Sequence, residues 1–123
     1  MKPAEDLSLR PHLLRAIYEW CAEQKYTPYL TAAARRGDVR VPPAAIVEDA
    51  VIFNISQAAV RDLHIGDSVS FTARFRGATS RVFLPAAAIT GIYARETGSG
   101  MAFAAVAESA AAPPEDKPTL RIV

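Results

Sequence analysis

The clearest hydrophobic pattern in the chain belongs to the segment SLRPHLLRAIYEWCAEQKY, from Ser8 to Tyr26. Its apolar residues recur at the helical spacing i, i+3, i+4 and i+7, in a stripe formed by Leu14, Ile17, Tyr18 and Cys21. Pro11 is tolerated in a first helical turn, where its missing N–H has no intrahelical partner, and Ser8 is suited to cap the helix. The pattern therefore predicts a long N-terminal helix.

A second apolar stripe, formed by Leu13, Ala16 and Trp20, lies about a third of a turn from the first. A helix that is apolar over well more than half of its surface has more to bury than one small domain usually covers. Two interpretations remain: a central core helix, or a helix that packs its own domain on one side and a partner on the other. We favour the second, and an isologous dimer is its commonest form.

Beyond Pro28 the pattern changes to the two-residue period of β-strands. In SVSFTARFRG, the polar residues Ser70, Thr72, Arg74 and Arg76 alternate with Val69, Phe71, Ala73 and Phe75. Strand-like segments cover residues 29–33, 39–42, 50–56, 68–77, 81–85 and 89–96, whereas residues 57–63 are expected to form a helical turn at most. About five short strands predict a mainly β fold with an N-terminal α-helix. The candidates are small, strongly bent OB or Sm-like barrels or partly open sheets.

Composition narrows the class of protein. The chain has 123 residues, which predicts one domain, and half of them are hydrophobic, as in a globular protein. The formal net charge of +1 gives little long-range attraction to nucleic acid or to an anionic membrane. A single cysteine fits a reducing compartment, and neither a signal-peptide pattern nor a membrane-spanning run of about 18 apolar residues is present. We therefore expect a cytoplasmic protein with no membrane partner.

The C-terminal segment has a different character. Residues 101–116 are Ala-rich and show neither periodicity nor caps, which predicts a disordered C-terminal tail, with a short helix as the alternative. The last seven residues, KPTLRIV, have too few apolar side chains to join the core across such a linker, which indicates a partner outside the chain. The predicted organisation is a domain over residues 1–100, a flexible linker over 101–116 and a docking peptide over 117–123.

Residues that could carry catalysis are few and scattered. His12, His64 and Cys21 have no metal-ligand spacing, and Cys21 is more typical of a buried small hydrophobe than of a nucleophile. No Gly-rich phosphate loop, nucleophile elbow or HExxH motif occurs. We therefore expect no enzymatic activity, no metal site and no cofactor.

The polar face of the 68–77 segment carries Arg74 and Arg76, with Arg61 and Arg81 as candidate neighbours. Three interpretations stay open. The arginines could form a solvated face, or they could line a groove for an extended peptide with acidic or amide residues. They could also bind single-stranded RNA, with Phe71 or Phe75 stacking on bases, although the near-neutral net charge weakens this alternative.

Six blocks in order, RPHLLRAIYEW, TPYL, VIFNIS, SFTARFRG, IYARE and KPTLRIV, resemble the SspB (stringent starvation protein B) family of specificity-enhancing adaptors of the ClpXP protease. The similarity runs from about Leu9 to the last residue and is interrupted only in the linker. It implies an Sm-like small β-barrel that forms a homodimer. It also implies an adaptor that binds ssrA-tagged polypeptides and tethers them to the ClpX unfoldase; the alternative is a small-barrel module for single-stranded RNA.

The resemblance also implies roles for individual residues. The helix of the family forms the dimer contact, so the interface candidates are Leu14, Ile17, Tyr18 and Cys21. The implied peptide groove consists of Phe71, Thr72, Ala73, Arg74 and Phe75, with Ile52 and Asn54 on a neighbouring strand and Gln57 and Ala58 just after it. The motif that docks on the N-terminal zinc-binding domain of ClpX matches Lys117, Pro118, Thr119, Leu120, Arg121, Ile122 and Val123.

Two departures from the family pattern bear on these roles. The linker is short and Ala-rich, and about 15 to 20 flexible residues reach roughly 20 to 27 Å, so engagement of one ClpX by both tails of a dimer would be geometrically tight. Arg76 stands where the family has glycine, and the peptide preference near that edge is therefore expected to differ.

Overall fold

The computed structural model describes residues 7–103, and these begin with the predicted helix. A 3-10 turn, Leu7–Leu9, leads into α1, Arg10–Gln24. Leu9 rather than Ser8 occupies the N-cap position, because the chain is already wound in the 3-10 turn before α1 begins. After the helix, the left-handed backbone of Lys25 (φ 62°) turns the chain so that the Tyr26 N–H donates to the Cys21 carbonyl over 2.8 Å.

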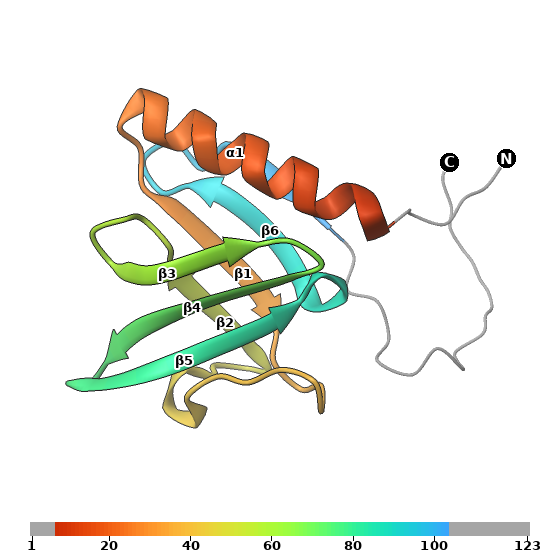
Figure 1. The fold of residues 1–123 in the computed structure, drawn as a ribbon, viewed down its shortest axis with the longest axis vertical. Coiled ribbons are helices and arrows are strands. Elements are labelled where there is room, and N and C mark those ends of the chain that lie inside the picture. Colours follow the sequence, from red (N-terminus) through yellow and green to blue (C-terminus); the bar gives the residue numbers. More distant parts are fainter. Residues whose placement is uncertain (1–6, 104–123) are drawn as a thin grey trace, which may run out of the picture.

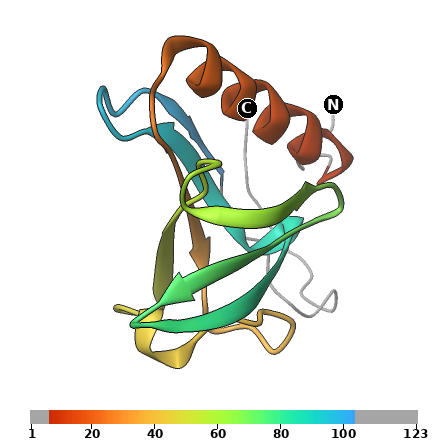
Figure 2. The ribbon, with the colours of Figure 1, turned by 60° about the vertical axis from the view of Figure 1, so that its left-hand side comes forward.

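Seven short strands follow α1 in the described residues and form two antiparallel sheets. One sheet has the order β2-β1-β6-β7 and the other has the order β3-β4-β5. The strands are β1 Pro28–Ala33, β2 Ala50–Asn54, β3 Val60–Ile65, β4 Ser68–Phe75, β5 Ala78–Pro85, β6 Ile89–Ala94 and β7 Gly100–Ala102. Helix α1 lies across one end of both sheets, close to β6, β1 and β3 (Figure 1, Figure 2).

The predicted mainly β fold with one N-terminal helix is confirmed. The alternating segments 50–56 and 68–77 contain β2 and β4, and the predicted strands 29–33, 81–85 and 89–96 overlap β1, β5 and β6. Within residues 7–103 no ladder joins the two sheets into a closed barrel. The Sm-like barrel therefore stays a prediction.

Three local predictions were wrong. Residues 60–65 form β3 instead of a helical turn, because pairing with β4 outweighs their weak local preference. Residues 39–42 make only an isolated bridge, Arg40 to Phe83, since the following Pro42–Pro43 pair lacks backbone donors and leads into a 3-10 turn. The predicted linker is also not wholly irregular, because Gly100–Ala102 pairs with β6 as β7.

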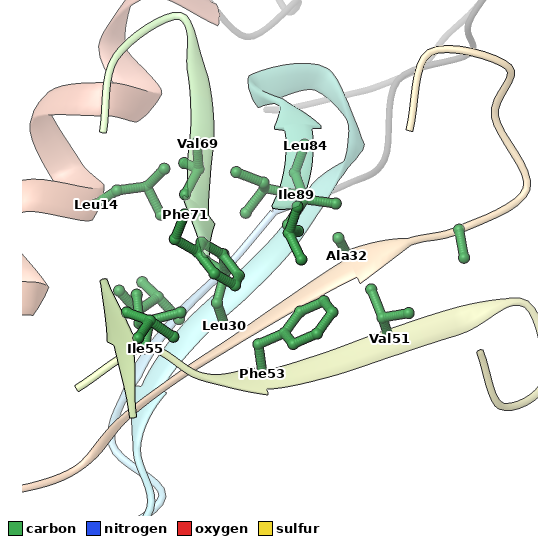
Figure 3. Packing of buried hydrophobic residues seen from close by; sticks show 14 residues of the cluster. Leu14, Leu30, Ala32, Val51, Phe53, Ile55, Val69, Phe71, Leu84 and Ile89 are labelled. Atoms are coloured by element: carbon green, nitrogen blue, oxygen red, sulfur yellow. The ribbon is translucent and has the colours of Figure 1, made fainter. Parts of the chain in front are cut away.

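The core fills the space between the two sheets and the helix. Leu14 of α1 points toward Val69 of β4, and the rings of Phe53 and Phe71 meet edge to face with centroids 5.3 Å apart (Figure 3). Leu14 and Phe71 are fully buried. Side chains from α1, β2 and β4 thus pack into one cluster, and full burial of each large apolar side chain contributes about 1.5 to 3 kcal/mol.

The start of α1 is held by a buried arginine. Arg10 is fully buried, and its guanidinium donates to the Ala86 carbonyl over 3.0 Å and to the Ile89 carbonyl over 2.8 Å. The Cζ atom of Arg10 also lies 4.8 Å from the ring centroid of Phe103, within the range of a cation–π interaction. These contacts join the beginning of the described chain to its end.

Candidate functional site

A groove runs between the edge strand β2 and the end of β4. Among residues 7–103, β2 forms a ladder only with β1, and an isolated bridge joins its first residue, Ala50, to Val47. The later part of β2, from Ile52 to Asn54, lines this groove. The cavity has a volume of about 420 Å³. It is lined by Pro42, Ala44, Ala45, Val47, Ile52, Phe53, Asn54, Ala59, Ala73, Arg74, Phe75 and Arg76. Apolar side chains from the loop before β2 therefore face arginines and a phenylalanine from β4 and the residue after it.

A second cavity, of about 540 Å³, adjoins the groove. The two cavities share Ala59, Ala73 and Arg74. The second is lined in addition by Gln57, Ala58, Val60, Arg61, Thr72 and Thr79. A third cavity, of about 250 Å³ and lined by Tyr18, Ala22, Lys25, Tyr26, Pro28 and Ser56, shares Gln57 with the second. Concave surface thus continues from the end of β4 to the C-terminal end of α1.

The side-chain alternation of β4 explains why Ala73 lies where the core opens into the groove. Val69 and Phe71 point into the core, and Ala73 and Phe75 follow on the same face but are only partly buried. Because Ala73 ends at a methyl group, a ligand backbone can approach β4 closely at this point.

Asn54 is held in place by a local hydrogen bond. The Ser56 backbone N–H donates to the Asn54 Oδ1 atom over 3.0 Å, which forms an Asx-type turn at the end of β2. The side-chain oxygen is therefore engaged within the protein, and the amide nitrogen is the part of Asn54 that can donate to a ligand carbonyl.

Nearly all the predicted groove residues lie on this concave surface. Ala73 and Arg74 line both of the first two cavities, and the others are divided between them: Ile52, Asn54 and Phe75 in the first, Gln57, Ala58 and Thr72 in the second. Phe71 lies elsewhere, because it is fully buried against Phe53 beneath the groove. Its side chain supports the groove from the core side and is not on the surface.

Several lining residues were not among the sequence predictions. Val47 and its neighbours come from the loop 42–47, whose irregular backbone gives no periodic signal. The sequence indicates Arg61 only as a candidate neighbour of Arg74, and the pairing of β3 with β4 brings it to the second cavity. Arg81, the other candidate neighbour, does not line the second cavity but lies beside it on the sheet. Its guanidinium donates a hydrogen bond to the Thr72 hydroxyl over 3.0 Å.

Two of the four predicted dimer residues are enclosed in the core, and the other two are partly exposed. Leu14 and Cys21 are fully buried in their own domain, and Ile17 and Tyr18 are partly buried against the core. Burial, together with the charge of Glu96, raises the pKa of the Cys21 thiol, and burial raises the pKa of the Tyr18 phenol. Leu14 and Cys21 therefore cannot form a direct interface, and the outward side of α1 carries the second stripe, Leu13, Ala16 and Trp20.

The predicted ClpX-docking residues 117–123 and most of the predicted linker lie outside the described residues. Among residues 7–103, no three His, Cys, Asp or Glu side chains gather closely enough to hold a metal ion. None of the described helices has the length and apolar character needed to cross a lipid bilayer.

The fold and the groove together define a small β-sheet domain with an open surface suited to an extended ligand. A family model described as "Stringent starvation protein B", SspB, matches residues 8–121, so the chain belongs to the SspB family. A "Stringent starvation protein B homolog" of Haemophilus influenzae is 38% identical over 95 residues. That match covers 76% of this chain but only 63% of the relative's length.

Proposed function

We propose that this protein is a proteolysis adaptor. It binds ssrA-tagged polypeptides in the groove between β2 and β4 and tethers them to ClpX through residues 117–123, so that ClpXP degrades them faster. It acts in the cytoplasm as a homodimer and performs no chemistry itself. The observation that carries the proposal is that Ile52 and Asn54 of β2 line the same cavity as Ala73, Arg74 and Phe75 of β4, as a tag-binding groove requires.

An extended tag would use both walls of the groove. Beyond Ala50, which is bridged to Val47, the edge of β2 offers backbone groups to a peptide strand, and the small Ala73 allows that strand to approach β4. Val47 and Ile52 are 68% and 58% exposed, respectively, and a bound peptide would cover them. Backbone hydrogen bonds would then provide most of the affinity, and the pockets for side chains would determine which peptide sequences are preferred.

Tethering explains why a family member needs no catalytic site. Joining a tag-binding groove and a ClpX-docking peptide in one chain raises the effective concentration of substrate at the unfoldase, which can increase apparent affinity by about 10² to 10⁴. The family match extends to residue 121 and so includes most of the proposed docking peptide.

The outward stripe of α1 is the proposed dimer interface. Leu13 and Trp20 are partly exposed there, and Leu9, one turn earlier, is 50% exposed. A Trp20→Glu variant should sediment as a monomer where the wild-type protein sediments as a dimer. Wild-type protein that sediments as a monomer at every accessible concentration would contradict the dimer.

Two measurements test the adaptor function. A labelled ssrA peptide should bind with an increase in fluorescence anisotropy, and the protein should accelerate degradation of an ssrA-tagged reporter by ClpXP. Deletion of residues 117–123 should leave peptide binding intact and abolish the acceleration. If the truncated protein still accelerates degradation, tethering through these residues is wrong.

The second candidate function is binding of single-stranded RNA. It is favoured by Arg61, Arg74 and Arg81, which form no ion pair with a carboxylate of the described residues. Tight RNA binding with a steep salt dependence, in a protein that fails to bind the ssrA peptide, would favour this function over the adaptor.

A further inference from the structure

The second cavity is distinguished by its charge. Of the residues that line it, Arg61 and Arg74 are ionised, and none is acidic. Strand pairing places both arginines on one face of the sheet, because Arg61 is directly opposite Thr72 and Arg74 follows Thr72 by two residues. Such diagonal neighbours have Cα atoms about 7 to 8 Å apart, so two long guanidinium groups can reach one carboxylate between them.

No ion pair within residues 7–103 neutralises this charge. The ion pairs of the described residues are formed by Arg35, Arg36 and Arg95, not by Arg61 or Arg74. Arg81 adds a third guanidinium on the other side of Thr72. Asp62 follows Arg61 but has a left-handed backbone (φ 54°), and it forms no ion pair with either lining arginine.

We infer that this cavity is a carboxylate subsite, in which Arg61 and Arg74 receive an acidic side chain of the peptide that lies across Ala73. The inference rests on the proposed function and names one preference of the bound peptide. Guanidinium groups match carboxylates with paired N–H donors, and the hydroxyls of Thr72 and Thr79 provide further donors at the wall. In an extended peptide successive side chains alternate, so an acidic residue can enter this cavity while its neighbours contact the apolar groove.

A peptide fits the cavity better than a nucleic acid strand. Single-stranded nucleic acids are held largely by bases stacked on aromatic side chains, and no aromatic residue lines this cavity. The two small residues Ala59 and Ala73 at its junction with the groove instead leave room for a peptide backbone.

The experiment uses the full chain and a labelled ssrA peptide in which a single Glu or Gln is placed at each position in turn. Anisotropy titrations should find one position at which Glu binds about 5-fold more tightly than Gln at low ionic strength, the size expected for an exposed ion pair. Added salt should reduce this preference. The Arg61→Gln, Arg74→Gln double variant should bind the Glu and Gln peptides with equal affinity, whatever its overall affinity. The Arg95→Gln variant is the matched control, because Arg95 lies in the β6–β7 turn, and it should keep the preference.

The outcomes separate the subsite from the adaptor function. Failure of the wild-type protein to bind any peptide in the series would contradict the proposed function itself. Binding without a Glu-over-Gln preference, or a preference that survives in the double variant, would overturn the subsite alone. Displacement of the peptide by single-stranded RNA in wild-type protein but not in the double variant would also overturn it, because the cavity would then bind phosphates.

Both arginines are exposed, so the double variant should melt like wild type. Arg61→Lys, which keeps the charge, should retain part of the preference and provides a second test.

Discussion

Val69 and Phe71, in the first half of β4, are fully buried, whereas Ala73 and Phe75, on the same face in the second half, are only partly buried. The alternation of side chains is the same in both halves. What differs is the facing layer, because the first half is covered by α1 and the opposite sheet, and the second extends past them into the groove. One strand can therefore stabilise the fold at one end and present a ligand surface at the other.

The largest expected effect tests the buried half. Phe71→Ala should lower the free energy of unfolding by about 3 to 5 kcal/mol, because it removes a fully buried ring packed on Phe53. Denaturant titration followed by circular dichroism measures this loss. The matched variant Phe75→Ala should cost less stability and should weaken tag binding. Equal losses of stability in the two variants would remove the distinction between the halves.

The next effect tests the open half. Ala73→Gln should weaken binding of the labelled ssrA peptide at least about 10-fold by filling the groove, and it should change the free energy of unfolding by less than about 1 kcal/mol. Ala102→Gln, the same change at an exposed position of β7, is the control and should affect neither property. Normal tag binding by the Ala73→Gln protein would place the groove elsewhere.

On the β2 side of the groove, two substitutions of Asn54 distinguish its contribution to stability from its contribution to tag binding. Asn54→Ala removes the hydrogen bond from the Ser56 N–H and should cost about 0.5 to 1.5 kcal/mol of stability, together with about 5-fold in tag affinity. Asn54→Asp keeps the acceptor for Ser56 but loses the amide donor, so stability should recover while affinity stays low. Full affinity in Asn54→Asp would show that the amide nitrogen makes no contact with the tag.

The smallest effect concerns pH and a contact far from β4. Hydrogen bonds from the Thr27 N–H and the Thr27 hydroxyl, both 2.7 Å, lower the pKa of Glu96 from 4.5 to about 2. A depressed carboxyl pKa contributes stability above the unfolded-state pKa, and this contribution is lost as the pH falls from about 4.5 toward 2.

The Glu96→Gln variant should therefore melt at a lower temperature than wild type near neutral pH, and the two melting curves should converge as the pH falls toward 2. Glu19→Gln, at an exposed position of α1, is the control and should follow wild type throughout. Tag affinity at neutral pH should be unchanged in Glu96→Gln, since this contact joins the start of β1 to the β6–β7 turn. A gap between the melting curves that stays constant with pH would show that the carboxylate does not contribute in this way.

The sequence predicted those helices and strands in which the spacing of apolar residues matches the side chains that are buried. The period of two across Val69–Phe75 identified β4, and the helical period identified α1. Strand β3 was missed because only Val60 among its residues is buried and its register shifts between Arg61 and His64. Strand β7 was missed because all three of its residues are exposed, so only pairing with β6 defines it.

The candidate site was predictable in part for the same reason. Similarity to the family indicated Ala73 and Asn54, but it could not show that Phe71 points into the core. Periodicity also could not decide which of two apolar stripes on α1 faces its own domain, because both have helical spacing. The cavity around Arg61 depends on the pairing of β3 with β4, which no local pattern predicted.

The anchor at Phe103 has a mechanical consequence. The Phe103 N–H donates to the Thr90 carbonyl over 2.8 Å, and its ring lies beside the buried Arg10. Within the part of the chain that the structure describes, the short strand β7 before it pairs with β6 alone. Tension applied to the chain beyond Phe103 is therefore borne first by this cation–π contact and the β6–β7 ladder. Strand β4 belongs to the other sheet, so the force reaches it only after the contacts of β7 and Phe103 have broken. A protein pulled by its C-terminal segment would lengthen by a few residues before β4, which forms one wall of the groove, felt the load.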